Sequence, residues 1–291
     1  MPASLDRSPG NERPALADAA RRAPDIATSA RDAWRGGRLS ERARCVLADN
    51  PSPLTYLGTN TWILSEPGCS GCVVVDPGPA MKDHLAAVRA AVDEDGLEVA
   101  LVVLTHDHAD HAEGAQAFAD AVRAPLVGRR AGTLPDGPLS VGVPGPRLEV
   151  LSLPGHSSDS VGFAFPDDGS IVTGDFIFLQ SSTLICWPDG SLSEYLESLD
   201  ALHRIVREQG AKTLLTAHGL PIVDPLSIIE RQGRHRRKRL ERVKAVIEDG
   251  AGRDLDRIME RVYKDVDARL NPAARCNVQA QLAYLEERGE L

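Results

Sequence analysis

The chain of 291 residues lacks the long apolar run that a membrane-spanning helix needs. A span requires about 18 consecutive apolar residues, whereas the run at Val99–Thr105 has only the length of a strand. The N-terminal segment also lacks the apolar stretch of a secretory signal, and its acidic residues Asp6, Glu12 and Asp18 argue against a transit peptide. We therefore expect no membrane partner and a cytoplasmic location.

Cysteines are also few, and basic residues are outnumbered by acidic ones, 33 to 42. Five cysteines are an odd number in a chain of this size, which favours reduced thiols over a disulfide framework. Cys69 and Cys72 form a CxxC pair, but they lie in a Gly-rich turn with no second pair to complete a zinc site, so a redox or metal role is the weaker interpretation. The formal charge of −9 repels nucleic acid, so that any contact with RNA would need a local basic patch.

The remaining composition, with 42% hydrophobic and 26% charged residues, is typical of a folded chain with a sizeable core. Residues 1–40 have no sustained periodicity and are predicted to form a flexible N-terminal arm. Residues 41–225 alternate short strand-like runs with amphipathic helical patterns, which indicates an α/β (α+β) domain of packed sheets with helices outside. Residues 226–291 are predicted to form a small, highly charged helical domain, whose third helix has Asn271 as its N-cap.

Histidines and aspartates gather after several of the predicted strands. The segment His106–His111 holds three imidazoles and two carboxylates directly behind a buried strand. His156, Asp175 and His218 each follow a later strand-like run. Because strand ends converge in a layered fold, and imidazole and carboxylate groups are common metal ligands, this pattern predicts a metal site.

The motif THDHADH resembles the HxHxDH signature of the metallo-β-lactamase superfamily, and PGHS, TGD and AHG follow in the order of its later ligand motifs. The resemblance implies an αβ/βα sandwich with a metal centre at one edge of the two sheets. It further implies two Zn²⁺ ions per chain, with iron or manganese as alternatives. One ion would be held by His106, His108 and His156 and the other by Asp110, His111 and His218, with Asp175 bridging both.

Two zinc ions about 3.5–4 Å apart can share a water and lower its pKa towards about 7, which provides a hydroxide nucleophile at neutral pH. Asp110 is predicted to be catalytic, because it could accept a hydrogen bond from this hydroxide and orient it. Asp76 is a candidate acceptor for a ligand histidine, and capping of the Asp-Pro-Gly turn is the equal alternative. His235 is a candidate proton donor to the leaving group, with a packing or surface role as the alternative.

The tail after Gly219 resembles the C-terminal extension of lactamase-beta-2-like metallo-hydrolases, which end in a winged-helix-like domain and include a single-strand RNA endonuclease. Hydrolysis of single-stranded RNA is therefore the first hypothesis, and a small-molecule thioester or lactone, as in glyoxalase II, is the alternative. A mononuclear iron persulfide dioxygenase is third. A homodimer is one option for the oligomeric state. A basic run could cradle phosphates, or it could be a solvated helix face; it comprises Arg231, Arg234, Arg236, Arg237, Lys238, Arg239, Arg242 and Lys244.

Overall fold

The computed structural model describes residues 34–129, 134–264 and 266–291. Most of the predicted N-terminal arm, residues 1–33, lies outside the described residues. Strand β1 (Gly36–Arg38) pairs antiparallel with β2 (Ala43–Leu47). Ordered strand structure therefore begins ahead of residue 41, where the sequence places the start of the catalytic domain.

The first sheet has six strands in the order β1-β2-β3-β4-β5-β6. Strands β1 to β4 are antiparallel to one another in sequence, whereas β5 is parallel to both β4 and β6. Continuous burial of β4 agrees with a strand that is covered on both faces. The strands not yet given are β3 (Asn60–Ser65), β4 (Gly71–Val75), β5 (Glu98–Val103) and β6 (Leu126–Val127).

The second sheet has five strands in the order β11-β10-β9-β8-β7. Strands β10 and β11 are parallel, and the other neighbours are antiparallel. As a result β8, β10 and β11 all point the same way, and their carboxyl ends reach one edge of the sheet. The strands are β7 (Gly137–Leu139), β8 (Leu148–Ser152), β9 (Val161–Phe165), β10 (Ser170–Gly174) and β11 (Thr213–Thr216).

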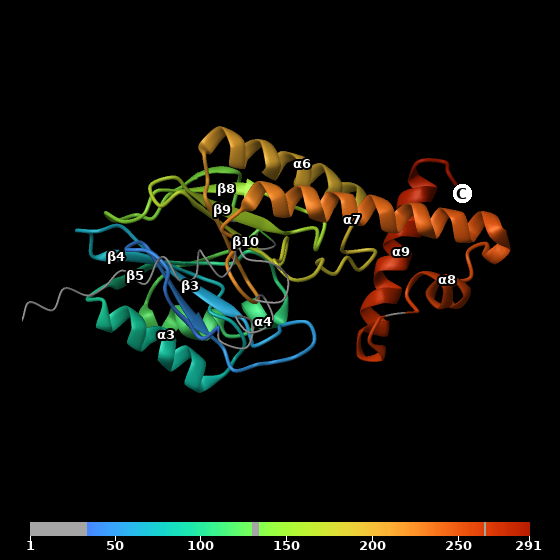
Figure 1. Cartoon of the computed structure of the whole chain (residues 1–291). Coiled ribbons are helices and arrows are strands. Elements are labelled where there is room, and N and C mark those ends of the chain that lie inside the picture. The colour runs from blue at the N-terminus through green and yellow to red at the C-terminus, as the bar shows by residue number, and fades with distance from the viewer. Residues whose placement is uncertain (1–33, 130–133, 265) are drawn as a thin grey trace, which may run out of the picture.

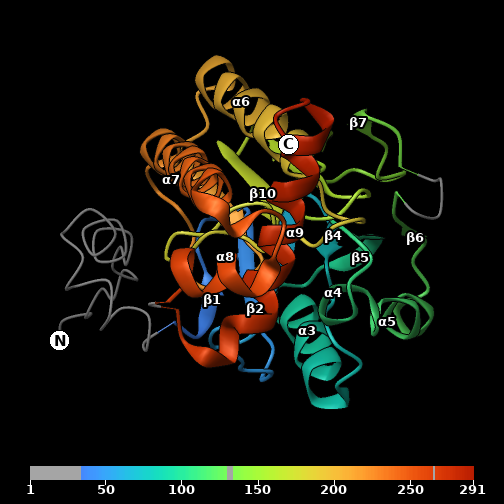
Figure 2. The same cartoon turned by 90° about the vertical axis from the view of Figure 1, so that its right-hand side faces the viewer.

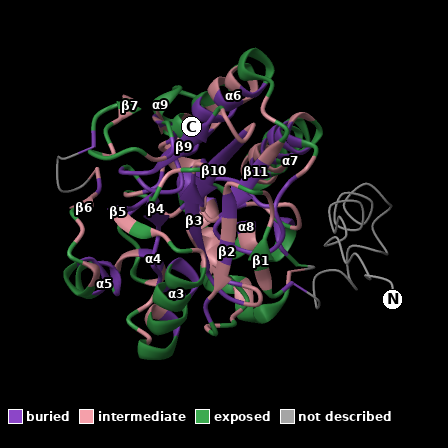
Figure 3. Cartoon of the chain, turned by 90° about the vertical axis from the view of Figure 1, so that its left-hand side faces the viewer, coloured by how far each residue is buried: buried purple, intermediate pink, exposed green. Residues whose placement is uncertain are grey.

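The two sheets pack face to face, and helices cover their outer faces (Figure 1). Helices α3 (Lys82–Glu94) and α5 (Ala115–Val122) cover the first sheet, and α6 (Leu192–Gln209) and α7 (Pro225–Val246) cover the second. Alternation along β3 explains the layers, because Trp62 packs between the sheets whereas Ile63 packs towards α3. The central strands β3, β4, β9 and β10 are accordingly buried along their whole length (Figure 3). The predicted αβ/βα sandwich is confirmed.

Three shorter elements follow α7: a π-helical turn (Ile247–Ala251), α8 (Leu255–Val262) and a 3₁₀ turn (Ala268–Leu270), before α9 (Asn271–Glu287). Helices α8 and α9 lie across one end of the sandwich (Figure 2). They share a core with the end of α7, formed by side chains such as Val243, Ile258 and Val278. Helix α9 begins at Asn271, but its cap position is Leu270 and no side chain caps it, so the predicted N-cap at Asn271 is wrong.

A disulfide joins Cys186, in the loop after β10, to Cys276 on α9. The expectation that all cysteines are reduced is therefore wrong. Cys45, Cys69 and Cys72 are free. None of the helices in the described ranges combines the length and the apolarity needed to cross a membrane.

Candidate metal centre

Each predicted ligand follows the carboxyl end of a strand. The chain leaves β5 at Val103 and turns into the short helix α4 (Ala109–Ala112), with His108 at its cap position in extended conformation. Four side chains of the HxHxDH segment are thereby divided between two adjacent groups of ligand atoms. His156, Asp175 and His218 follow β8, β10 and β11.

Three imidazole nitrogens converge in a first group. His108 Nδ1 lies 2.9 Å from His106 Nε2 and 3.0 Å from His156 Nε2. A proton on His108 Nδ1 can be donated to only one of these nitrogens at a time, so that hydrogen bonding alone does not account for the trio. Nitrogen ligands of a tetrahedral zinc ion, at 2.0–2.1 Å from the metal, are about 3.3 Å apart. The spacing of the first group therefore fits one cation.

A second group lies beside the first. Asp110 Oδ2 is 3.2 Å from His218 Nε2 and 3.5 Å from His111 Nε2. Asp175 connects the two groups, because its Oδ1 is 3.2 Å from His218 Nε2 whereas its Oδ2 is 3.6 Å from His156 Nε2. The seven predicted residues thus form two adjacent sets of ligand atoms that share one carboxylate.

Two buried atoms of the second group test whether the residues suit metal ions. His111 Nε2 and Asp175 Oδ1 have no hydrogen-bond partner among the described residues, although they are 3.4 Å apart. A buried polar atom without a partner costs about 1–3 kcal/mol. Coordination to a cation would satisfy both atoms, and imidazole and carboxylate are suitable donors for zinc. The donor set therefore fits two divalent ions.

Hydrogen bonds fix the rings of the ligand histidines from behind. In four of the five, all except His108, the Nδ1 atom faces away from the ligand groups and has an oxygen acceptor, so that Nε2 is left for a metal ion. The pairs are His106 with Thr105 Oγ1 (3.1 Å), His111 with Asp76 Oδ2 (2.8 Å), His156 with Leu184 O (2.6 Å) and His218 with Gly58 O (3.2 Å).

Asp76 is the most heavily used of these acceptors. It is buried, and its backbone is left-handed, with φ of 49°. Besides His111, its carboxylate accepts hydrogen bonds from the Thr105 amide at 2.7 Å and the Thr105 hydroxyl at 2.6 Å. Of the two interpretations of Asp76, support of a ligand histidine is the one that the structure shows.

The two groups differ in their titration. Burial lowers the pKa of His106 and of His156. Burial also opposes the charged form of His218, but the nearby Asp175 and Asp110 carboxylates outweigh it and raise the pKa of His218 to about 9. Protons on the second group therefore balance its carboxylates, and metal ions would bind in exchange for protons.

His235 lies on an exposed part of α7. Partial burial, followed by the charges of neighbouring arginines, lowers the pKa of this imidazole. In the described part of the chain it makes no hydrogen bond to a ligand residue. Its role as a proton donor stays a prediction.

Most residues of the predicted basic run make contacts within the molecule. Arg234 pairs with Glu230, Arg237 with Asp200, and Lys244 with Glu290. Three further members also make contacts inside the molecule: Arg239 stacks on Tyr263, Arg231 donates to the Leu179 carbonyl and Arg236 is buried. Lys238 and Arg242 have no ion-pair partner in the described ranges. The interpretation as a helix face with intramolecular pairs therefore accounts for most of this run.

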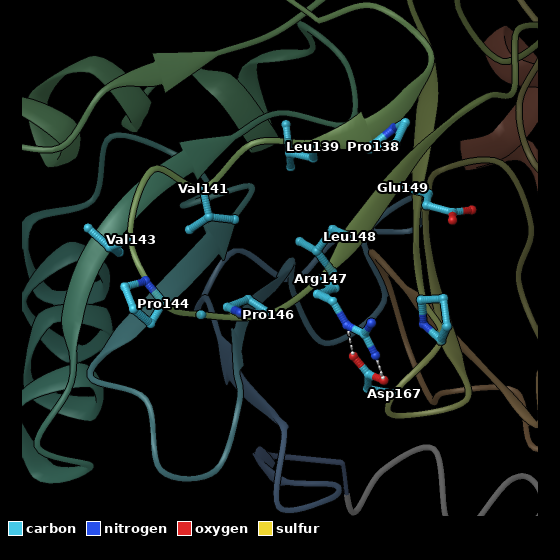
Figure 4. A pocket seen from close by; sticks show the side chains of 12 residues that line it. Pro138, Leu139, Val141, Val143, Pro144, Pro146, Arg147, Leu148, Glu149 and Asp167 are labelled. Carbon is cyan, nitrogen blue, oxygen red and sulfur yellow. Dashed lines mark hydrogen bonds and ion pairs between the residues drawn. The ribbon is translucent and has the colours of Figure 1, made fainter.

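A pocket lies around β7, β8 and the loop between them (Figure 4). Prolines and aliphatic side chains line it together with the ion pair of Arg147 and Asp167. None of the seven predicted ligands lines this pocket.

The supporting atoms were not evident from the sequence. Leu184 and Gly58 act through main-chain carbonyls, which carry no signal in the residue type. Thr105 was detectable in principle, because it immediately precedes the first ligand and can bond both Asp76 and His106.

Comparisons with known proteins agree with this geometry. The family model described as metallo-beta-lactamase superfamily matches residues 54–138, and the beta-lactamase associated winged helix domain matches residues 255–290. A beta-lactamase-like protein 2 homolog from Caenorhabditis elegans is 24% identical over 263 residues, covering 85% of this chain and 85% of that protein. An atrochrysone carboxyl ACP thioesterase from Aspergillus chevalieri is 30% identical over 223 residues, covering 72% of this chain and 66% of that protein. The crystal structure of a beta-lactamase domain protein from Burkholderia ambifaria has the same fold, with a TM-score of 0.71 and 20% identity over 88% of this chain and 89% of that one.

Proposed function

The chain belongs to the metallo-β-lactamase superfamily, and from this premise we propose that it is a binuclear zinc hydrolase that cleaves acyl thioesters. The observation that carries the binuclear part is the position of Asp175, whose two carboxylate oxygens face different ligand groups. A mononuclear iron oxygenase would use only three protein ligands and would leave the other four convergent side chains without a role.

Two bound zinc ions would supply a hydroxide nucleophile at neutral pH and stabilise the negative charge that develops on the attacked group. The side chains of this protein then orient the reacting groups. Asp110 accepts a hydrogen bond from the attacking water and positions it. Asp110 Oδ2 lies within 3.5 Å of the Nε2 atoms of His111 and His218, so that these three side chains would hold one of the two ions. Burial favours the neutral form of Asp110, but the neighbouring imidazoles of His111 and His218 outweigh it and keep the pKa of Asp110 well below its usual range, so that the carboxylate is ionised.

Charge favours a thioester over a polyanion as the substrate. The chain has a formal charge of −9, and intramolecular contacts occupy most of the basic run on α7. A thiolate is also a good leaving group and needs little help from a protein acid. The likeness to a protein named as an acyl carrier protein thioesterase supports the same choice.

Single-stranded RNA is the second candidate. It is favoured by Lys238 and Arg242, whose charges have no ion-pair partner among the described residues. It is also compatible with the match of residues 255–290 to the beta-lactamase associated winged helix domain, which agrees with the resemblance of the tail that raised this candidate. Phosphate contacts by these two side chains would make binding dependent on salt.

The test uses the purified full chain with measured zinc content. Hydrolysis of a panel of acyl thioesters and of single-stranded RNA is compared between the wild type, the double variant Lys238→Glu/Arg242→Glu, and a control of equal charge change on other exposed helical or loop positions, Lys82→Glu/Lys212→Glu. We expect thioester hydrolysis that neither double variant alters. RNA cleavage that only the α7 variant and salt suppress, without thioester hydrolysis, would replace the thioester by RNA.

A further inference from the structure

The loop between β10 and α6 connects the metal centre with the C-terminal helices. On one side, the Leu184 carbonyl oxygen lies 2.6 Å from His156 Nδ1 and fixes the orientation of that ring. The neighbouring Thr183 hydroxyl donates to the Asp175 carbonyl, so that the loop also touches the bridging aspartate. The position of this loop therefore determines where His156 Nε2 points.

On the other side, two side chains from different helices hold the loop on both flanks of Leu184. Arg236 on α7 donates to the Thr183 carbonyl. The Asn277 side-chain oxygen on α9 accepts a hydrogen bond from the Ile185 amide at 3.2 Å and another from Arg236 at 3.0 Å. The two side chains thus form one hydrogen-bonded unit around the carbonyl group that orients His156.

Arg236 is unusual among the basic residues of α7. It is only 5% exposed, its guanidinium lies 5.1 Å from the Tyr195 ring centre, and it has no carboxylate partner in the described part of the chain. Burying a charge without a counter-ion is costly, and its hydrogen bonds to the loop carbonyl and to Asn277 are the compensation that the structure provides. Such a residue fixes its acceptors more firmly than an exposed arginine would.

We propose that Arg236 and Asn277 are positioning residues for the metal centre, which hold residues 183–185 so that the Leu184 carbonyl orients His156. The C-terminal helices thereby set the affinity of the first ligand group for its metal ion. This inference rests on the proposed binding of two metal ions. Loss of a contact that orients a ligand typically weakens metal binding by about 10–100-fold.

The disulfide between Cys186 and Cys276 joins the same loop to the same helix, because Cys186 follows Ile185 and Cys276 precedes Asn277. It could hold the loop when the hydrogen bonds are removed. The test is therefore carried out in the wild-type background and repeated in a Cys276→Ser background.

The experiment measures the two stepwise dissociation constants of Zn²⁺ by competition with a chromophoric chelator, in the full chain. The variants are Arg236→Met and Asn277→Ala, with Asn277→Asp as the conservative change that keeps an oxygen acceptor for the Ile185 amide. The matched control is Arg239→Met, because Arg239 lies on the same helix but contacts Tyr263 and the Val262 carbonyl instead of the loop. Circular dichroism and thermal unfolding of the metal-free proteins report whether each variant is folded.

We expect Arg236→Met and Asn277→Ala to weaken one of the two Zn²⁺ constants by about 10–100-fold in at least one background, with the other constant nearly unchanged. Asn277→Asp and Arg239→Met should bind like the wild type. If Arg236→Met does not fold, Asn277→Ala decides. Folded variants that bind both ions like the wild type in both backgrounds would overturn the inference, whereas a wild-type chain that binds fewer than two ions would overturn the proposed function instead.

Discussion

Replacement of Asp76 by asparagine tests how the sheet supports the metal centre. The two Asp76 oxygens accept three hydrogen bonds: Oδ1 from the Thr105 amide, and Oδ2 from the Thr105 hydroxyl and His111 Nδ1. An asparagine has only one acceptor oxygen. If this oxygen takes the place of Oδ2, the new NH₂ group faces the Thr105 amide, and two donors meet in a buried site.

The opposite orientation of the asparagine is worse for metal binding. Its NH₂ group would then face His111, which could accept this hydrogen bond only by moving its own proton to Nε2, the atom needed by the metal. One unsatisfied buried donor costs about 1–3 kcal/mol of stability. Loss of the charge-assisted bond to His111 should weaken binding of the second metal ion by about 10–100-fold, which corresponds to about 1.4–2.7 kcal/mol.

The assay combines chelator competition for Zn²⁺ with denaturant unfolding of the metal-free protein. Asp167→Asn is the matched control, because it makes the same chemical change in the surface pair with Arg147. Surface pairs contribute only about 0–1 kcal/mol, so that the control should stay close to the wild type in both measurements. Equal Zn²⁺ affinity of Asp76→Asn and the wild type would refute the proposed support of His111.

Three further predictions address chemistry and stability. Asp110→Ala should lower kcat/KM by about 10²–10⁴-fold, because the variant loses both a ligand and the group that orients water; activity within tenfold of the wild type would contradict this role. His235→Asn should leave thioester hydrolysis within a few-fold of the wild type but reduce RNA cleavage, because only an alkoxide leaving group needs a proton donor; an equal loss with both substrates would contradict this distinction. Burial lowers the pKa of His84 from 6.5 to about 4, so the folded state binds fewer protons than the unfolded chain between these values. The resulting stability is present above pH 6.5 and is lost as the pH falls towards 4, by up to about 3 kcal/mol, and denaturant unfolding at several pH values should show a weaker pH dependence for His84→Gln than for the wild type.

The sequence predicts the sandwich and the convergence of the ligand residues because both depend on local patterns. Apolar runs reveal the buried strands, and the ligands follow strand ends, where a layered fold brings them together. Strands β1, β2 and β7 were not predicted, since two of them have only three residues and none has a long apolar run. The Cys186–Cys276 disulfide joins residues 90 positions apart, and a count of cysteines does not specify such a pairing.

The arginines of α7 show where residue type ceases to be informative. In the sequence, Arg236 and Arg237 are adjacent members of one basic run, and composition gives both the same interpretation as a phosphate-binding or solvated face. Tertiary packing separates them, because Arg236 points inward to the Thr183 carbonyl and Asn277 whereas Arg237 reaches the exposed Asp200. The difference comes from the Thr183 carbonyl and from Asn277 on helix α9, which lie far from α7 in the sequence. The charges of a helix that packs on a catalytic domain can therefore be assigned to substrate binding only when its packing partners are known. For Arg236, these partners connect the helix to the loop beside the metal centre.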